Sequence, residues 1–513
     1  MYCLSLRLVC VCLFLVTLRS LLSAQSEAQS PESLPTRTIS PVPDLYAAAE
    51  EAVTGPEDHS LAARAVYTVR NDGEEPLHIL SLYLRHPLRF TEVTVGDRPA
   101  RGRMSPGTLG GLPAARLELE LVTPLPPGQS RQIAYAWTTS YARHPFGRKP
   151  IGFAPERGFI LCESGWYPHT STTFSMFSYQ MEIAAPPGCL ALTSGELADR
   201  RSSATGEVFS YDCAIPSLPY LVWGRYRIST AEIGGARVEI WTPSSGAIEP
   251  EPMRACLAEV LALYDRLLPP TVVTGHRIVA VTRFGGYGPA GTLLLQDTYF
   301  DPEALARAES VDLVAHELAH SWVNAIARPA GDLMLSLSEG IATFFGARAV
   351  EEVVGSEAAR EIWAGRRDEY QPLFRRTVAP IELTERIQHA DNAMFRAVTY
   401  TKSCFFLREM ETLLGEEAFF AALHAALEDH RGGEFTFDDL AAALARTGGE
   451  EVRECYRRYA EERDLPDYVV LPTADEPGTG SLVLENRGAP CPVPVRVVGC
   501  EADVWKIVIF SIN

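Results

Sequence analysis

The chain of 513 residues lacks the short motifs that mark several large enzyme classes. It has no Gly-x-Ser-x-Gly nucleophile elbow and no phosphate-binding loop with a Gly-Lys-Ser/Thr ending. It also has no Gly-x-Gly-x-x-Gly segment that follows a strand and opens a helix, which dinucleotide binding requires. These absences exclude the elbow-type serine hydrolases, the P-loop nucleotide hydrolases and the dinucleotide-binding enzymes.

Clustered positive charge is missing as well. The sequence has 46 Lys and Arg against 65 Asp and Glu, which gives a formal net charge of -19. No run of Lys and Arg forms the basic stripe that a nucleic acid partner needs, so we expect no nucleic acid partner. The remaining composition is that of an ordinary globular protein, long enough for about three domains.

The amino terminus carries the only long hydrophobic run, Leu8–Leu18, between Arg7 and Arg19. Eleven residues are too few to cross a bilayer comfortably, and they match the apolar core of a signal peptide. We predict a signal peptide over residues 1–28, with cleavage after the small residues of Ser26-Glu27-Ala28, and Leu22-Ser23-Ala24 is the second choice of cleavage site. The alternative is an uncleaved anchor, which would be the one membrane attachment. In both cases we expect export, to a secreted, periplasmic or cell-surface location.

Cysteine is sparse and forms no metal-binding Cys-x-x-Cys pair. Of the 11 cysteines, three belong to the export segment, which leaves eight in the mature chain. An even number permits disulfides without establishing them. Cys491 with Cys500 and Cys189 with Cys213 are the plausible local pairs, and buried free thiols are the open alternative.

The order of strand-like and helix-like patterns predicts an α+β multidomain chain. Alternating or apolar runs with Asn-Asp-Gly and Pro-Pro-Gly turns come first, as in antiparallel sheets, and a mixed region and an almost entirely helical region follow. In the tail, two strand-like runs joined through Asn486-Arg487-Gly488 look like the opening of a β-domain that the chain does not complete. The predicted divisions are signal peptide 1–28, linker 29–45, amino-terminal β-domain 46–232, mixed domain 233–372, helical part 373–470 and partial β-like tail 471–513.

One helical window carries two histidines at metal-ligand spacing. Apolar residues recur every three to four positions from Ser310 to Ala327, which predicts a core helix. His316 and His320 then stack on one face, so both imidazoles can reach a single cation. Glu317 sits beside them and can act as general base and then acid on a zinc-bound water.

A second helix-like window, Leu333 to Val350, supplies the third predicted ligand. It carries Glu339 nineteen positions after His320, close enough in sequence to return antiparallel and offer its carboxylate. Two imidazoles and one carboxylate leave a zinc position for water, as hydrolysis requires, so we predict one zinc ion per chain. Thr343 can steady a ligand by hydrogen bonding, or it is an ordinary helix threonine. An accidental motif on an ordinary helix is the alternative for the whole group.

These residues resemble the M1 family of gluzincin aminopeptidases. His316-Glu-Leu-Ala-His-Ser-Trp322 is similar to the family's metal helix, and Leu337-Ser-Glu-Gly340 is similar to its second-ligand segment, with Ser338 in place of the usual Asn. Tyr400-Thr401-Lys402 resembles the family's Tyr-Glu-Lys signature. The resemblance implies a thermolysin-like catalytic domain over 233–372. It also implies that the Tyr400 hydroxyl stabilises the oxyanion of the tetrahedral intermediate.

The sequence departs from the family where the substrate's free amine is held. Gly285-Gly286-Tyr287-Gly288-Pro289 aligns with the family's Gly-Ala-Met-Glu-Asn segment, so the amine-binding glutamate is missing. We expect Gly285 to Gly288 to contact substrate. Glu163, just ahead of Trp166, is a possible substitute anchor, or an exposed loop acid. Arg277 to Thr282 and Thr292 to Leu295 look like an edge strand that can pair with an extended peptide.

The resemblance implies a zinc metallopeptidase that acts on peptides or proteins. The missing glutamate, and the lack of room for the family's large helical carboxy-terminal domain, leave open a peptidase without strict free-amine specificity. A non-catalytic peptide-binding or scaffold protein that keeps the fold is a further alternative. Intact Glu317 and Tyr400 argue against it, because these residues serve chemistry more than folding.

Overall fold

The fold was examined in a computed structural model of the chain. The structure describes residues 53–55, 60–85, 89–96, 98–140, 151–154, 156–172, 174, 176–203, 206–246, 248–282, 285–376, 379–382, 392–462, 468–472, 482–486, 493–501 and 504–512. The predicted signal peptide 1–28 and linker 29–45 lie outside these residues.

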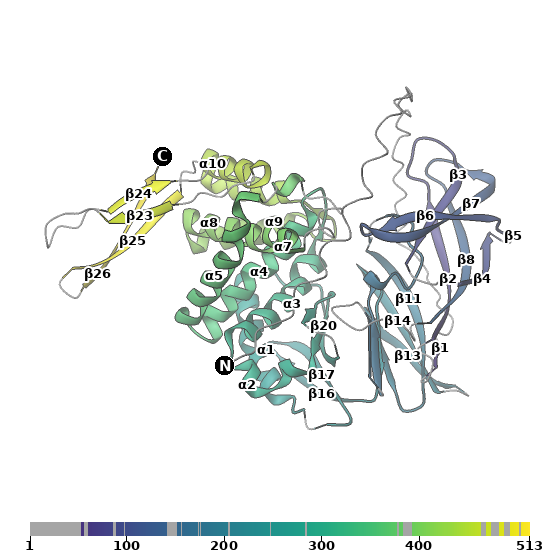
Figure 1. The fold of residues 1–513 in the computed structure, drawn as a ribbon. Coiled ribbons are helices and arrows are strands. Elements are labelled where there is room, and N and C mark those ends of the chain that lie inside the picture. The colour runs from purple at the N-terminus through teal and green to yellow at the C-terminus, as the bar shows by residue number, and fades with distance from the viewer. Residues whose placement is uncertain are drawn as a thin grey trace, which may run out of the picture. The chain divides into compact units, whose positions relative to one another are not determined.

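The first half of the described chain consists of antiparallel strands (Figure 1). They are β1 (Val53–Gly55), β2 (Ser60–Arg70), β3 (Leu77–Leu84), β4 (Arg89–Val95), β5 (Arg98–Pro99), β6 (Gly102–Leu109), β7 (Leu112–Leu125), β8 (Ser130–Ser140), β9 (Ile151–Ala154), β10 (Arg157–Ile160), β11 (Phe177–Ala185), β12 (Leu190–Leu192), β13 (Glu196–Ser203), β14 (Gly206–Ser217) and β15 (Leu221–Gly224). They form four sheets with the orders β1-β2-β8-β4-β5, β3-β7-β6, β12-β15-β10-β9 and β11-β14-β13. The short 3-10 helix η1 (Cys162–Ser164) follows β10.

Alternation of apolar and polar residues explains why these strands form sheets with one buried face. In β7, Leu117, Leu119 and Leu121 are buried while Glu120 between them is exposed. Aromatic side chains fill the layer between the sheets; the rings of Tyr67 and Tyr135, for example, meet edge to face at 4.8 Å.

A mixed sheet of five strands begins the second half, in the order β16-β17-β18-β20-β19. Its strands are β16 (Tyr226–Ile233), β17 (Ala236–Pro243), β18 (Gly275–Val281), β19 (Gly286–Tyr287) and β20 (Thr292–Gln296). Strands β17, β18 and β20 run parallel, and β16 and β19 are antiparallel to their neighbours. The sheet includes β16, which crosses the boundary predicted between residues 232 and 233.

The central sheet is buried on both faces. In β18, Ile278 and Ala280 pack into the core shared with the helices, whereas Val279 and Val281 pack into the core shared with the amino-terminal strands. Successive side chains of a strand point to opposite faces, so one apolar run serves two cores. The sheet therefore packs against both hydrophobic cores, one on each face.

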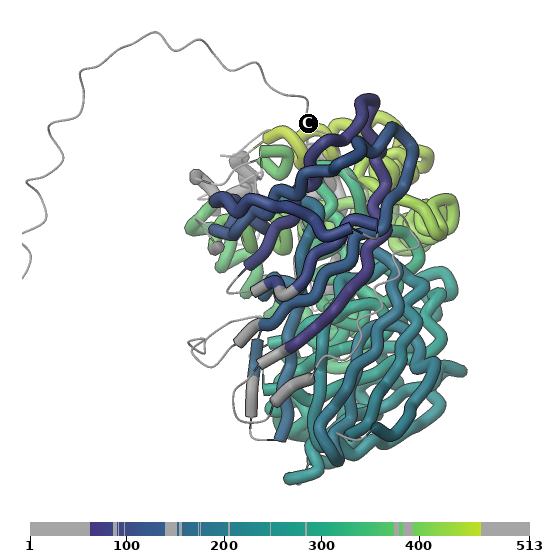
Figure 2. Tube along the Cα trace, turned by 90° about the vertical axis from the view of Figure 1, so that its right-hand side faces the viewer, coloured from purple at the N-terminus to yellow at the C-terminus, as the bar shows by residue number. Residues whose placement is uncertain are grey.

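Helices make up most of the chain after the central sheet. Figure 2 shows this change along the chain, with extended tubes in purple to teal and coiled tubes in green to yellow. The helices are α1 (Glu251–Leu267), η2 (Asp297–Phe300), α2 (Pro302–Leu305), α3 (Ala308–Ile326), α4 (Met334–Val353), α5 (Ser356–Tyr370), η3 (Gln371–Arg376), η4 (Pro380–Glu382), α7 (Asn392–Arg396), η5 (Ala397–Lys402), α8 (Ser403–Leu414), α9 (Glu416–Asp429) and α10 (Phe437–Glu461). A short parallel pair, β21 (Arg328–Pro329) and β22 (Glu434–Phe435), links α3 to the segment before α10.

Local sequence signals explain several helix ends. Gly415 closes α8 with a φ of 82°, a conformation that side-chain-bearing residues rarely adopt. Thr436 opens α10 with a capping box, in which its side chain accepts from the Asp439 amide and the Asp439 carboxylate accepts from the Thr436 amide. No helix among the described residues is long and apolar enough to cross a membrane.

The predicted α+β multidomain organisation is confirmed, with antiparallel sheets first, a mixed catalytic-type domain next and helices after it. The prediction that Arg277–Thr282 and Thr292–Leu295 form an edge strand is wrong. Strands β18 and β20 are interior, and the edge strand is β19, which comes from the Gly-rich segment itself.

In the tail, β24 (Leu482–Asn486) pairs with β23 (Tyr468–Pro472), and β25 (Val493–Glu501) pairs with β26 (Val504–Ile512). The suggested Cys189–Cys213 disulfide is wrong, and the open alternative holds, because both residues are buried free thiols. The other predicted pair involves Cys491, which lies outside the described residues.

Candidate metal centre and active site

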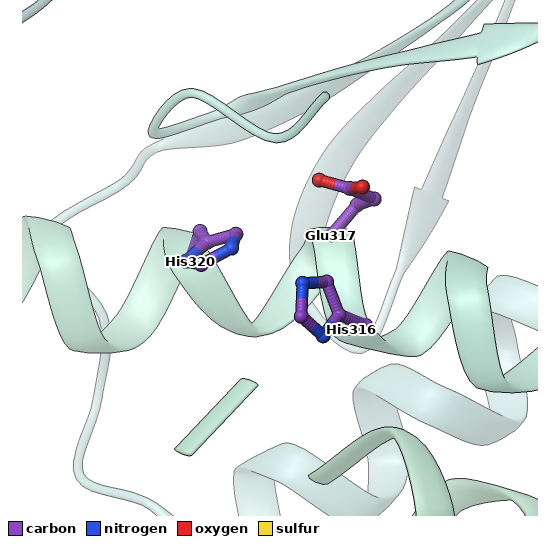
Figure 3. A group of neighbouring side chains, drawn as sticks. All are labelled: His316, Glu317 and His320. Atoms are coloured by element: carbon purple, nitrogen blue, oxygen red, sulfur yellow. The ribbon is translucent and has the colours of Figure 1, made fainter. Parts of the chain in front are cut away.

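Helix α3 brings the two histidines together on one face. The rings of His316 and His320 are one turn apart and meet edge to face, with centroids 5.2 Å apart. Figure 3 shows both rings and the Glu317 carboxylate rising from this helix. Apolar neighbours such as Leu318 and Ala319 are fully buried, so the helix is fixed in the core and its polar side chains have little freedom.

Helix α4, which packs beside α3 in Figure 1, brings Glu339 to the two rings. Its Oε2 atom lies 3.2 Å from His316 Nε2 and 3.7 Å from His320 Nε2. Burial opposes ionisation of this carboxyl, but the imidazoles and the Tyr400 hydroxyl outweigh burial and lower the pKa of Glu339 to about 2. The carboxylate is therefore ionised at neutral pH.

These three atoms fit a divalent cation. Glu339 Oε2 is buried and accepts no hydrogen bond from the described residues, although it faces two imidazole nitrogens. Such an uncompensated buried oxygen is costly unless a cation or a donor occupies the space between these atoms. Burial lowers the pKa of His320 to about 4, which keeps that ligand neutral. For His316, nearby acids outweigh burial and raise the pKa.

Both carboxylates near the histidines were compared as third ligands. Ligand atoms of His316, Glu317 and His320 lie within 4.8 Å of one another. Glu339 Oε2 lies closer than that limit to both Nε2 atoms, at 3.2 and 3.7 Å. Glu339 Oε2 is therefore placed to complete a three-ligand set with the two histidines, and Glu317 lies beside the same two histidines.

The outer nitrogens of the two histidines contact polar groups. Thr343 Oγ1 lies 3.3 Å from His316 Nδ1, and Ser338 Oγ lies 3.4 Å from His320 Nδ1. For His316, a hydroxyl oxygen that accepts from Nδ1–H leaves the Nε2 lone pair directed at the metal position. Asn324 Nδ2 also lies 3.2 Å from His320 Nδ1, and its spacing of four residues from His320 could have revealed this contact in the sequence.

The Gly-rich segment passes directly over Glu317. A Cβ atom at Gly286 would lie 2.5 Å from Glu317 Oε1, and one at Gly288 would lie 2.2 Å from the Glu317 backbone oxygen. No residue with a side chain fits at that distance, which explains the glycines. Gly285 adopts a φ of 97° and its carbonyl accepts from the Gln296 amide, so the segment turns and then pairs with β20.

Tyr400 lies on a single π-helical turn, η5, an arrangement frequent at functional sites. Its ring stacks on His316 at a centroid distance of 5.9 Å. Gly340 on α4 lets Ser403, which follows η5, lie close to that helix, because a Cβ atom at Gly340 would lie 2.4 Å from Ser403 Cβ. Burial, and then the negative charges of Glu339 and Glu317, raise the pKa of Tyr400 well above its usual value. The hydroxyl therefore remains protonated and able to donate.

Nothing in the sequence indicated that Lys402 is buried. It is fully buried, and its ammonium donates to the carbonyl of Glu462, the residue that ends α10. The partial negative charge at a helix carboxy terminus favours a cation there. Lys402 also lies 5.9 Å above the ring of Tyr459. These contacts tie the turn that carries Tyr400 to the carboxy-terminal end of α10.

Cys162, next to Glu163, contacts Tyr287 of the Gly-rich segment. Cys162 Sγ in η1 lies 3.7 Å from the Tyr287 hydroxyl in β19, so Glu163 is brought beside the Gly-rich segment. Glu163 Oε2 is buried without a hydrogen-bond partner among the described residues. Its backbone carbonyl accepts from Arg85 Nη1 at 2.6 Å. The structure thus joins Glu163 to the predicted substrate segment.

The comparisons with known proteins agree with this geometry. The Peptidase family M1 domain matches residues 289–459. The sequence is similar to Aminopeptidase M1 of Arabidopsis thaliana, with 29% identity over 160 residues that cover 30% of this chain and 18% of that protein. It is also similar to Aminopeptidase N of Streptomyces lividans, with 26% identity over 198 residues, 34% of this chain and 22% of that protein. The matched part spans about a fifth of each relative's length.

Among solved structures, the fold is similar to an M1 zinc metallopeptidase of Deinococcus radiodurans, crystallised as a mutant bound to a Tyr-Ser-Ala substrate. The TM-score is 0.62 at 19% identity, and the match covers 83% of this chain and 97% of that one. This likeness establishes a shared two-part fold of antiparallel sheets followed by a mixed and helical domain.

Proposed function

Because the chain belongs by its matched domain to peptidase family M1, we propose that it hydrolyses peptide bonds with one zinc ion held by His316, His320 and Glu339. The observation that carries the proposal is that two Nε2 atoms lie within 3.7 Å of one ionised carboxylate oxygen. Two neutral imidazoles and one carboxylate form a three-ligand set used for catalytic zinc in peptidases.

Zinc in this position, when bound, acts as a Lewis acid and makes a water nucleophilic at neutral pH. Glu317 is the group that takes the proton of the attacking water and delivers it to the leaving amine. Its side chain lies next to the histidines and directly below Gly286, so a peptide placed along this segment has the base within reach. The 7% exposed fraction of Glu317 keeps bulk water from competing for the carboxylate.

Tyr400 is assigned to the oxyanion. Its hydroxyl is protonated and its half-buried ring stacks on His316, so the hydroxyl can donate to the oxygen that becomes negative in the tetrahedral intermediate. Such a donor acts only where charge develops, so it lowers the barrier without tightening substrate binding. The Lys402 contacts hold the turn that aims this hydroxyl.

Substrate binding is assigned to the edge strand β19 and to Glu163. The edge strand offers backbone groups to an extended peptide, as in strand addition. Glu163 Oε2 is buried without a described partner, and the neighbouring Cys162 contacts Tyr287, so the Glu163 carboxylate can hold the ammonium of a free amino terminus. We therefore favour an aminopeptidase of short peptides, similar in ligand size to the tripeptide bound by the Deinococcus enzyme.

Export belongs to the proposal on sequence grounds. The apolar run at residues 8–18, followed by small residues near 28, supports removal of a signal peptide and action outside the cytoplasm. Amino-terminal sequencing of protein recovered from the producing cells, with the cell fraction recorded, tests this point.

A single assay tests the proposed activity. The purified chain is given a free-amine peptide and its acetylated twin, with and without a chelator, beside a Glu317→Gln variant. We expect chelator-sensitive turnover that zinc restores and that Glu317→Gln abolishes, with strong preference for the free amine. Equal turnover of the twins would indicate a peptidase without strict free-amine specificity. Absence of chelator-sensitive turnover would leave a peptide-binding protein.

A further inference from the structure

Arg396 is an exposed cation at the edge of the candidate active site. It is the last residue of α7, and its guanidinium carbon lies 5.5 Å from the centre of the Tyr400 ring. The same ring also contacts His316, at 5.9 Å, and Phe395, at 6.3 Å. The Tyr400 ring therefore contacts both the exposed Arg396 guanidinium and the His316 imidazole.

Arg396 differs from most arginines of the helical half. None of the described carboxylates lies within 4.0 Å of it, so among the described residues its partner is the Tyr400 ring. Between residues 340 and 462, nine other described arginines pair with carboxylates: Arg348, Arg366, Arg367, Arg408, Arg431, Arg446, Arg453, Arg457 and Arg458. Cation–π stacking fixes the guanidinium plane and leaves its hydrogen-bond donors unused.

The charges around the metal position decide what this cation can bind. Like-charge repulsion excludes a substrate carboxylate from the side of the site that carries Glu163, Glu317 and Glu339. Arg396 offers the opposite charge and a planar fork that matches a carboxylate. It stands 5.5 Å from the oxyanion tyrosine ring, which is less than two residues of an extended peptide.

We propose that Arg396 binds a substrate carboxylate on the carboxy-terminal side of the scissile bond. The substrate class is then short acidic peptides: those whose own carboxy terminus lies one or two residues past the cleaved bond, or those with Asp or Glu there. The inference rests on the proposed function, which places the free amine at Glu163 and the scissile carbonyl at Tyr400. Arg396 is a specificity-determining residue and takes no part in proton transfer.

Equilibrium binding in the Glu317→Gln background tests this without any need for turnover. The probes are an unhydrolysed tripeptide acid and its carboxamide, and a second carboxamide pair that has Glu or Gln after the scissile bond. We expect the acid to bind about tenfold tighter than its carboxamide, and the preference to weaken as salt is added. Adding Arg396→Gln should bring the ratio close to one, and Arg396→Lys should leave an intermediate ratio.

Arg360→Gln is the matched control, because Arg360 is exposed on α5, has no described carboxylate partner and makes no described contact with the Tyr400 ring. It should leave the acid preference unchanged. The first peptide pair reports a carboxy-terminal carboxylate and the second pair reports a side-chain carboxylate. Absence of preference in both pairs overturns the proposal, as does an equal loss of acid and carboxamide binding in Arg396→Gln, which would indicate a role in positioning Tyr400.

The two hypotheses fail separately. If the parent chain shows no chelator-sensitive turnover while the Glu317→Gln background still prefers acids through Arg396, the proposed catalysis is wrong and the carboxylate site stands. If turnover is normal and the acid preference is absent, the carboxylate site alone is wrong.

Discussion

The metal-binding side and the substrate-binding side of the site differ in how completely their polar groups are partnered. On α3 and α4, the outer nitrogens of both histidines contact hydroxyl groups, and the inner nitrogens face one carboxylate. On the substrate side, Glu163 Oε2 and Arg85 Nη2 are buried without described hydrogen-bond partners, and the expected carboxylate is replaced by glycine.

This difference separates chemistry from selectivity. The groups that hold a metal and move protons are fixed by their neighbours, so their roles follow from geometry. The groups proposed to bind the substrate keep hydrogen-bonding atoms without described partners, and their roles appear only when a ligand is present. Substitutions on the two sides should therefore change different kinetic constants.

The largest expected effect is on the metal side. Glu339→Ala should remove bound zinc and lower kcat/KM by more than about 1000-fold, exceeding the loss of a single oxyanion donor. Elemental analysis and turnover measured on the same preparation check this. Glu352→Ala, an exposed substitution further along the same helix, should keep both zinc and activity. A fully active, zinc-loaded Glu339→Ala protein would contradict the ligand assignment.

Tyr400→Phe should lower kcat by about 100-fold to 1000-fold and leave KM nearly unchanged, because the hydroxyl acts on charge that develops in the transition state. Steady-state kinetics with saturating zinc measures both constants. Tyr456→Phe, which removes a hydroxyl bonded to Asp438 at 2.7 Å, is the control and should be close to wild type. A rise in KM without loss of kcat would place Tyr400 on the substrate side instead.

Glu163→Gln tests the substrate-binding side of the site. Removal of the negative charge should reduce the preference for a free-amine peptide over its acetylated twin by about tenfold to 100-fold. The measurement is the ratio of kcat/KM for the twins. Glu120→Gln, on the exposed face of β7, should leave the ratio unchanged. An unaltered ratio in Glu163→Gln would show that the amine is held elsewhere.

Gly288→Ala should lower kcat/KM by about tenfold, because its Cβ would meet the Glu317 backbone oxygen at 2.2 Å and displace β19 from the base. Activity and the midpoint of thermal unfolding are measured together. Gly365→Ala on α5 has open space around its Cβ and should instead stabilise the fold by about 0.5 to 1 kcal/mol. Normal activity in Gly288→Ala would mean that the Gly-rich segment moves freely.

The smallest expected effect concerns the core behind the site, where His276 stacks on Trp322 of α3 at 5.7 Å. Burial lowers the pKa of His276 to about 4, so the folded chain stays neutral there while the unfolded chain takes up a proton below about 6.5. Stability is thus lost as pH falls from about 6.5 towards 4. Between pH 7 and 5, wild type should lose about 2 kcal/mol more than His276→Phe in denaturant titrations.

The control for this pH effect is His424→Gln, since His424 is exposed on α9. Its loss of stability between pH 7 and 5 should equal that of wild type. An equal loss in His276→Phe would contradict the assignment of the buried imidazole as the titrating group.

Short-range patterns in the sequence predicted the metal side. The spacing of His316 and His320 fixes their common helix face, and the apolar periodicity around Glu339 predicts the neighbouring helix. Both helices are present, within a few residues of the predicted bounds. Local spacing determines such features, so one sequence is enough to find them.

Features that depend on long-range pairing could not be predicted in this way. The edge position of β19, the partners of the tail strands and the free state of Cys189 and Cys213 follow from which strands come together in space. Periodicity defines which face of a strand is buried but does not choose its neighbour. Similarly, the burial of Lys402 against the end of α10 joins residues that are 60 positions apart, and no local signal marks it.

The most direct test of the central claim is the zinc content of the purified chain, titrated against its peptide hydrolysis. The account predicts one zinc per chain, activity that falls in step with zinc removal, and full recovery when one equivalent is returned. Hydrolysis that persists in metal-free protein, or a zinc-loaded chain that cleaves no peptide, would contradict it.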